Sequence, residues 1–241
     1  MKATDSITYK IDRLPNGYIF TYIDFMDMVN RKEAIIKALN RMTKSGKIAK
    51  LSKGKYYKIE ITQFGNLEPD QYQVVKDLLE MDGKVSGYLT GFSTYNKLGL
   101  TTQISNTIQI GKNNVRPGFK RGRYTISFIK QKNIITKDNI YLLQILDAIK
   151  YIKKIPDASI NTSFKRLLSI VKTLSMNDIE TMVRLALKYP SFTRALLGTM
   201  LEEAKNRTLV ETVRRTLNPI TIYKLPGIEK VSTLAKNWNI K

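Results

Sequence analysis

The first 25 residues combine a helical pattern of apolar residues with a short extended one. Apolar side chains recur every three or four positions over residues 5–14, which predicts a first helix, and Pro15 and Gly17 end it. Residues 18–20 then read as a short extended stretch. Thr21 stands where an N-cap residue is expected, so a second helix is predicted directly after it.

The third predicted helix has apolar and cationic side chains on opposite faces. Asn30 and Glu33 have the spacing of a capping box, so the helix is expected to begin at Arg31. Four residues at helical spacing form its apolar face: Ile35, Ala38, Leu39 and Met42. Gly46 suits the left-handed backbone position that commonly ends a helix.

Two short strands, predicted over residues 47–52 and 56–61, follow the third helix. Residues 52–55 form the turn between them, where Gly54 readily adopts a positive φ. Three helices, the third leading into a β-hairpin, are the pattern of a winged helix-turn-helix. The sequence therefore predicts a winged-helix domain over residues 1–62.

The charge of the chain suggests what this domain binds. There are 41 Lys and Arg against 20 Asp and Glu, a net charge of +21, and such an excess attracts polyanions, nucleic acid first among them. The third helix would enter the major groove of double-stranded DNA, and the hairpin would reach phosphates or the minor groove. The residues predicted to contact DNA are Arg31, Lys32, Lys37, Asn40, Arg41, Lys44, Lys53 and Lys55. The alternatives are a solvated polar helix face and a genome that favours lysine.

A larger domain is predicted over residues 70–241, after a linker over residues 63–70 that is rich in turn-forming residues. It begins with a helix around residues 72–79 and has alternating strands at 107–111 and 123–129. Beyond about residue 130 the apolar spacing is helical, with segments at 138–153, 161–174, 177–188, 191–205 and 208–217. The chain as a whole is predicted to be α+β, a winged helix followed by a mixed α/β domain that ends in helices.

A second group of cations lies between the two predicted strands of the larger domain. The segment 112–123 contains five cations and no acid: Lys112, Arg116, Lys120, Arg121 and Arg123. It would serve as a second phosphate-contacting loop. A solvated hairpin connection explains the same residues equally well.

Several stretches resemble the AbiEi-type antitoxin family of type IV toxin–antitoxin systems, which act in abortive infection as a defence against phage. In the predicted winged helix they are IFTYIDF (19–25), ALNRMTKSGKI (38–48), LSKGKYY (51–57) and FG (64–65). LGLTTQIS (98–105) resembles the signature of the family's second domain. The resemblance covers roughly residues 10–130.

This resemblance implies a function that residue chemistry alone does not. A member of the family represses its own promoter through the winged helix. It also counters a nucleotidyltransferase-type toxin through the second domain, here residues 70–241. The resemblance implies a cognate toxin as a functional partner. Type IV systems do not require the antitoxin to form a stable complex with the toxin.

The absence of two residue types narrows the chemistry. With no histidine and no cysteine, the chain cannot use imidazole or thiolate chemistry, and it offers no zinc site of the usual kind. The glycine-rich segment 83–103 matches neither nucleotide-binding fingerprint, so no cofactor is expected. No apolar run suits a signal peptide or a membrane span. The sequence predicts a cytoplasmic protein that is not an enzyme.

The strongest alternative from another class is a Mg²⁺-dependent nucleic-acid enzyme. Asp157 with Glu203 and Lys205 has the residue types of a restriction-type nuclease site, in which the carboxylates hold the metal. That chemistry usually places the Glu-x-Lys pair on a core strand, whereas residues around Glu203 have a helical, solvent-facing pattern. A stand-alone RNA-binding module is the other alternative.

Overall fold

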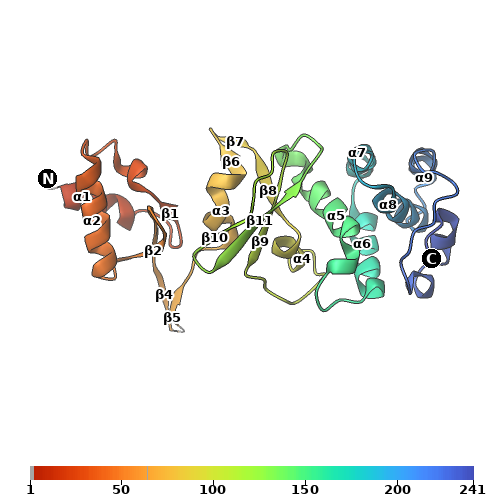
Figure 1. The fold of residues 1–241 in the computed structure, drawn as a ribbon, viewed down its shortest axis with the longest axis horizontal. Helices are drawn as coiled ribbons and strands as arrows, with labels where there is room; N and C mark the ends of the chain where they lie inside the picture. Colours follow the sequence, from red (N-terminus) through yellow and green to blue (C-terminus); the bar gives the residue numbers. More distant parts are fainter. Residues whose placement is uncertain (1–2, 64) are drawn as a thin grey trace. The chain divides into compact units, whose positions relative to one another are not determined.

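The structure is a computed structural model that describes residues 3–63 and 65–241 (Figure 1). The chain divides into two compact units, Met1–Asp77 with Phe119–Thr125 and Leu78–Gly118 with Ile126–Lys241. They are called unit 1 and unit 2 below. Both contain helices and small sheets, so the predicted α+β class is confirmed.

Unit 1 contains the winged helix that the sequence predicts. Its elements are α1 (Ala3–Asp12), β1 (Ile19–Phe20), the 3₁₀ helix η1 (Tyr22–Phe25), α2 (Lys32–Lys44), β2 (Ile48–Ser52) and β3 (Lys55–Lys58). The strands form an antiparallel sheet in the order β1-β3-β2. Gly46 and Gly54 have φ values of +74° and +76°, as their predicted roles at the helix end and the hairpin turn require.

The helix starts in unit 1 differ from the prediction. The second helix is a single 3₁₀ turn, and the capping box is at its start, where Thr21 and Asp24 satisfy each other's backbone amides. The predicted capping box of Asn30 and Glu33 is wrong. Arg31 has an extended backbone and is itself the N-cap, so Glu33 falls one position short of N3.

The core of unit 1 fixes α2 against the sheet. The apolar face of α2 packs with Ile7 and Ile11 of α1 and with aromatic rings from three other elements. The Phe20 ring meets Phe25 edge-on at a centroid distance of 5.6 Å and stacks on Tyr56 at 6.5 Å. Tyr56, a residue of the β2–β3 hairpin, therefore belongs to the same core as the apolar face of α2.

Residues 60–67, which the sequence assigned partly to a strand and partly to a linker, form a separate hairpin. It consists of β4 (Glu60–Thr62) and β5 (Gly65–Leu67). The predicted strand 56–61 therefore divides after Lys58, whose ammonium group donates to the carbonyl oxygens of Asp12 and Leu14. Phe64, one of the residues that resemble the antitoxin family, lies outside the described residues. The helix α3 (Gln71–Leu79) follows, as predicted.

The middle of the chain builds a four-stranded sheet in the order β10-β11-β9-β8. Its strands are β8 (Gly87–Thr90), β9 (Thr107–Lys112), β10 (Phe119–Arg121) and β11 (Tyr124–Lys130). The small hairpin β6 (Glu80–Met81) and β7 (Lys84–Val85) precedes it, and α4 (Phe92–Tyr95) follows β8. The predicted strands 107–111 and 123–129 are confirmed, whereas β10 forms inside the segment expected to be a connection.

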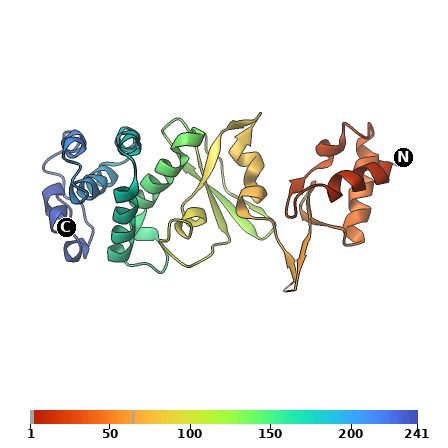
Figure 2. The same ribbon diagram turned by 180° about the vertical axis from the view of Figure 1, so that it is seen from behind.

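The predicted helices of the C-terminal part are confirmed. They are α5 (Ile140–Lys150), α6 (Ile160–Thr173), α7 (Met176–Ala186), α8 (Ser191–Glu203) and α9 (Arg207–Arg214). The 3₁₀ turn η2 (Lys137–Asn139) precedes α5, η3 (Ile152–Lys154) follows it, and η4 (Ile228–Lys230) comes after α9. Figures 1 and 2 show α5 between the sheet and the later helices. Ser175 is the N-cap of α7, and Pro190 is the N-cap of α8. The last elements are the 3₁₀ helix η5 (Thr233–Trp238) and a single bridge from Tyr223 to Ile240.

The LGLTTQ segment has a packing role in unit 2. Leu98 and Leu100 are buried in its main core. Between them Gly99 has φ +68°, and the guanidinium of Arg166 from α6 donates to the Leu98 carbonyl oxygen at 2.7 Å. The segment thus joins the end of α4 to α6. No helix in the described part of the chain is long and apolar enough to cross a membrane.

A buried polar network joins the sheet to the helices of unit 2. Asp147 of α5, which is 2% exposed, accepts hydrogen bonds from the hydroxyl groups of Tyr88 (2.8 Å), Thr90 (2.7 Å) and Tyr189 (2.8 Å). The Gln131 amide donates to both tyrosine hydroxyls. Burial raises the pKa of Asp147, and the three donors offset that rise only in part.

Candidate nucleic-acid interface

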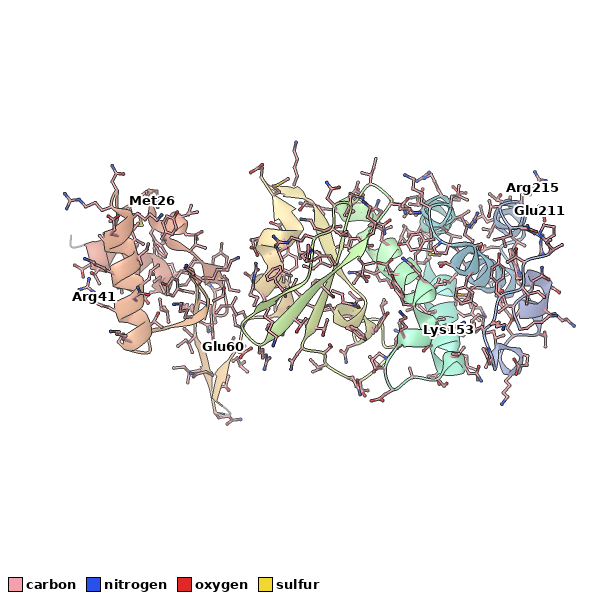
Figure 3. The ribbon with its side chains drawn as sticks, in the orientation of Figure 1. Met26, Arg41, Glu60, Lys153, Glu211 and Arg215 are labelled. Carbon is pink, nitrogen blue, oxygen red and sulfur yellow. The ribbon has the colours of Figure 1, made fainter. Side chains whose placement is uncertain are left out.

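The polar face of α2 is open to solvent along its length. Lys37, Asn40, Arg41 and Lys44, all predicted DNA contacts, are exposed, and the buried residues of α2 lie on the opposite side. Arg31 and Lys32 are exposed at the N-terminal end of the helix. Figure 3 shows Arg41 projecting outward from α2. These six residues therefore belong to one accessible face and one helix end.

The cations at the centre of this face are not neutralised by acids. Within residues 3–63 and 65–241, the recorded ion pairs involve none of Lys37, Arg41 and Lys44. Two acids of this unit are paired with other lysines, Asp12 with Lys47 at 3.1 Å and Asp27 with Lys10 at 2.9 Å. These ion pairs leave the positive charge of Lys37, Arg41 and Lys44 in place.

The two hairpin lysines differ in their surroundings. Lys53 is exposed at the turn, as a phosphate contact requires. Lys55 is partly buried, and its ammonium group lies 2.7 Å from a carboxylate oxygen of Asp77. The structure therefore gives Lys55 an internal partner that the sequence did not indicate.

Asp77 is the centre of an ion cluster within unit 1. The guanidinium of Arg121 donates to both of its carboxylate oxygens, at 2.6 and 3.0 Å, and also to the Val74 carbonyl oxygen at 2.6 Å. Partial burial by itself raises the pKa of Asp77, but hydrogen bonds from Arg121 and Lys55 outweigh it, and the pKa is lowered. The cluster fixes the base of the wing against α3.

The five cations of segment 112–123 do not form one exposed patch, which corrects the sequence-based grouping. Arg121 is only 7% exposed and holds Asp77, so it is a structural residue. Arg123 pairs with Glu68 at 2.8 Å, and Arg116 lies over the Phe128 ring at 5.4 Å. Lys112 is half-buried and Lys120 is exposed. Lys112 and Arg116 belong to unit 2, whereas the other three belong to unit 1.

The residues of the nuclease alternative have ordinary structural roles. Glu203 lies in the last turn of α8 and accepts from the Ser232 hydroxyl at 2.5 Å, and Asp157 accepts from the Gln103 amide. The described part of the chain contains no group of three or more acidic side chains arranged to hold a metal ion.

Sequence reasoning missed two residues that shape the interface. Tyr56, chosen only as part of a strand, donates its hydroxyl to the Oδ1 atom of Asn40 at 2.9 Å. Asp77, in a helix outside the predicted winged helix, engages Lys55. Both contacts join positions far apart in the sequence, and neither residue type carries a local signal for such a role.

Unit 1 thus contains a winged helix in which α2 has a cationic, solvent-exposed face. The chain belongs to the family of unknown function DUF6088, which it matches over residues 6–188. A crystal structure of the RV2827C protein from Mycobacterium tuberculosis is similar to it, with a TM-score of 0.50 at 13% sequence identity. That similarity covers 92% of this chain and 84% of the other, and at this identity it shows the fold alone. No curated protein matches the sequence.

Proposed function

We propose that this protein is a transcriptional regulator whose winged helix binds double-stranded DNA, with α2 in the major groove and Lys53 on the phosphate backbone. The observation that carries the proposal is the exposed face of α2, where Lys37, Arg41 and Lys44 surround Asn40. Within residues 3–63 and 65–241, the ion pairs include none of these three cations. The 13 residues of α2 span about 20 Å, and the major groove, about 12 Å wide, admits such a helix. A regulator of this kind acts in the cytoplasm.

The binding should depend strongly on salt. If α2 and the hairpin together neutralise about six phosphates, the logarithm of the binding constant falls with the logarithm of salt concentration at a slope of about −5. Replacing Lys37 and Arg41 together with alanine removes about two of these contacts. We expect the slope to become shallower by about 2 and the affinity at 0.1 M salt to fall about 60-fold. Fluorescence anisotropy with a labelled duplex of the upstream DNA, titrated at several salt concentrations, measures both.

The matched control is the double variant Lys84→Ala with Lys97→Ala, which changes the net charge equally. Both lysines are exposed in unit 2, outside the winged helix. This control should retain the slope and nearly all of the affinity. Equal losses in the two double variants would show that net charge, and not the α2 face, attracts the DNA, and would contradict the assignment.

We further propose, from the AbiEi-like segments at residues 19–57 and 98–105, that the protein represses its own promoter and neutralises a nucleotidyltransferase-type toxin. The large independent core of unit 2 supports a second activity, because the winged helix needs none of it to hold DNA. No stable complex with the toxin is required. The antitoxin activity is assigned to residues 70–241.

The full-length variant Lys37→Ala with Arg41→Ala should separate the two activities. It should lose repression of a promoter–reporter fusion, because DNA affinity falls, and it should still rescue the growth of cells that express the toxin encoded beside this gene. Growth with and without the variant, at matched protein levels, is the measurement. The wild-type chain failing to rescue would remove the antitoxin activity and leave the DNA-binding assignment standing.

A further inference from the structure

Asn40 is the one residue of the predicted DNA contacts that is neither Lys nor Arg, and it lies between Lys37 and Lys44 on the exposed face of α2. An ammonium or guanidinium group is attracted to any phosphate. A neutral amide lacks that charge attraction, and its directional hydrogen bonds can distinguish one base edge from another. Asn40 therefore differs in chemistry from its neighbours at the position that would face the groove.

The structure also fixes the orientation of this amide. The Tyr56 hydroxyl donates to Asn40 Oδ1 at 2.9 Å, and the Tyr56 ring is 4% exposed and stacked on Phe20 in the core of unit 1. A free surface asparagine rotates about its side-chain bonds and loses that freedom on binding. Here a core residue of the wing holds the amide before DNA arrives, which lowers the cost of binding.

We propose that Asn40 is a specificity-determining residue that reads an adenine in the major groove, and that Tyr56 is its positioning residue. The inference rests on the proposed DNA-binding function. Tyr56 uses one of the two lone pairs on Oδ1, and the other remains free. With Nδ2 donating to adenine N7 and Oδ1 accepting from N6, the amide makes the paired contact that distinguishes adenine from the other bases.

The two lysines one helical turn before and after Asn40 then have a different part in recognition. Lys37 and Lys44 attract phosphates on any sequence, so they set affinity, whereas the pair of Asn40 and Tyr56 sets preference. Affinity and preference can be measured separately. A residue with only a structural role in the wing would change both together or neither.

The experiment is a selection of binding sites from a random duplex library by the full-length protein, followed by affinities for the selected site and for single-base changes in it. Tyr56→Phe keeps the ring and removes the hydroxyl. It should reduce the preference for one adenine about tenfold while leaving the salt slope unchanged. Asn40→Asp removes the amide donor. The selected base at that position should change to cytosine, because the N4 amino group of cytosine donates a hydrogen bond to a carboxylate.

Tyr57→Phe is the matched control, because Tyr57 is the neighbouring tyrosine of β3 and has no recorded bond to α2. It should select the same motif as the wild type. An unchanged motif in both Asn40→Asp and Tyr56→Phe would overturn this inference and leave the DNA-binding function intact. A wild-type chain that binds no duplex would overturn both. If Tyr56→Phe does not fold, the exposed variant Asn40→Asp decides the question by itself.

Discussion

Replacing Asp147 with alanine is expected to lower the free energy of unfolding of unit 2 by about 4 kcal/mol. The change leaves three buried hydroxyl groups, those of Tyr88, Thr90 and Tyr189, without their acceptor. Each buried donor left unsatisfied costs about 1–3 kcal/mol, and removing a carboxylate that is itself costly to bury offsets part of the sum. Urea unfolding followed by fluorescence measures this loss, because the only tryptophan of the chain, Trp238, lies in unit 2.

Asp138→Ala is the control for this variant. Asp138 is an exposed carboxylate at the start of the segment that leads into α5. Its removal should change the free energy of unfolding by less than about 0.5 kcal/mol. If Asp147→Ala also changed the free energy of unfolding by so little, the three hydroxyl groups would have found other hydrogen-bond partners. The network would then not be what links the sheet to the helices.

The same carboxylate predicts the direction of a pH effect. Its pKa is raised in the folded state, so between the ordinary value of 3.8 and the raised one the folded state binds more protons than the unfolded state. The stability of unit 2 should therefore fall as pH rises through that window and then become constant. Asp147→Ala should lose this component, whereas Asp138→Ala should keep it.

Much of the fold could be predicted because its signals are local. Apolar spacing predicted the helices of the C-terminal part, α5 to α9. Gly46 and Gly54 marked two of the places in the winged helix where the backbone has a positive φ. The second helix was overestimated because the residues after the Thr21 cap also fit a single 3₁₀ turn. The predicted start of α2 was wrong by one position, because Arg31 has an extended backbone and is the N-cap. Arginine is not a residue type that indicates an N-cap.

The candidate interface was only partly predictable, for a related reason. Exposure of the α2 face follows from helical periodicity, so Lys37, Arg41 and Lys44 could be chosen from sequence. Which side chains form ion pairs and hydrogen bonds with one another depends on the tertiary structure. The pairing of Lys55 with Asp77 and the bond from Tyr56 to Asn40 join residues 22 and 16 positions apart, respectively, through different elements.

A glycine at the centre of α8 should be as sensitive as the buried aspartate. A Cβ atom at Gly198 would lie 2.2 Å from two ring carbons of Trp238, far inside van der Waals contact. In an open helix position Gly→Ala stabilises by about 1 kcal/mol. Here we expect Gly198→Ala to lower the free energy of unfolding by about 3 kcal/mol, because the rigid indole has to move. The sign of the change in the free energy of unfolding therefore distinguishes a clash with Trp238 from the usual gain of replacing a helical glycine with alanine.

Displacement of Trp238 should also be visible without unfolding. Its indole N–H donates to Glu202 at 2.6 Å and the Arg214 guanidinium lies 4.4 Å from the ring centroid, in a site where the residue is 3% exposed. Gly198→Ala should shift its fluorescence emission to longer wavelength as the ring meets water. In a Trp238→Leu background the same glycine change should cost much less, because the clashing ring carbons are gone. An equal cost in both backgrounds would mean that the strain lies in the helix backbone and not in the packing of the C-terminal segment on α8.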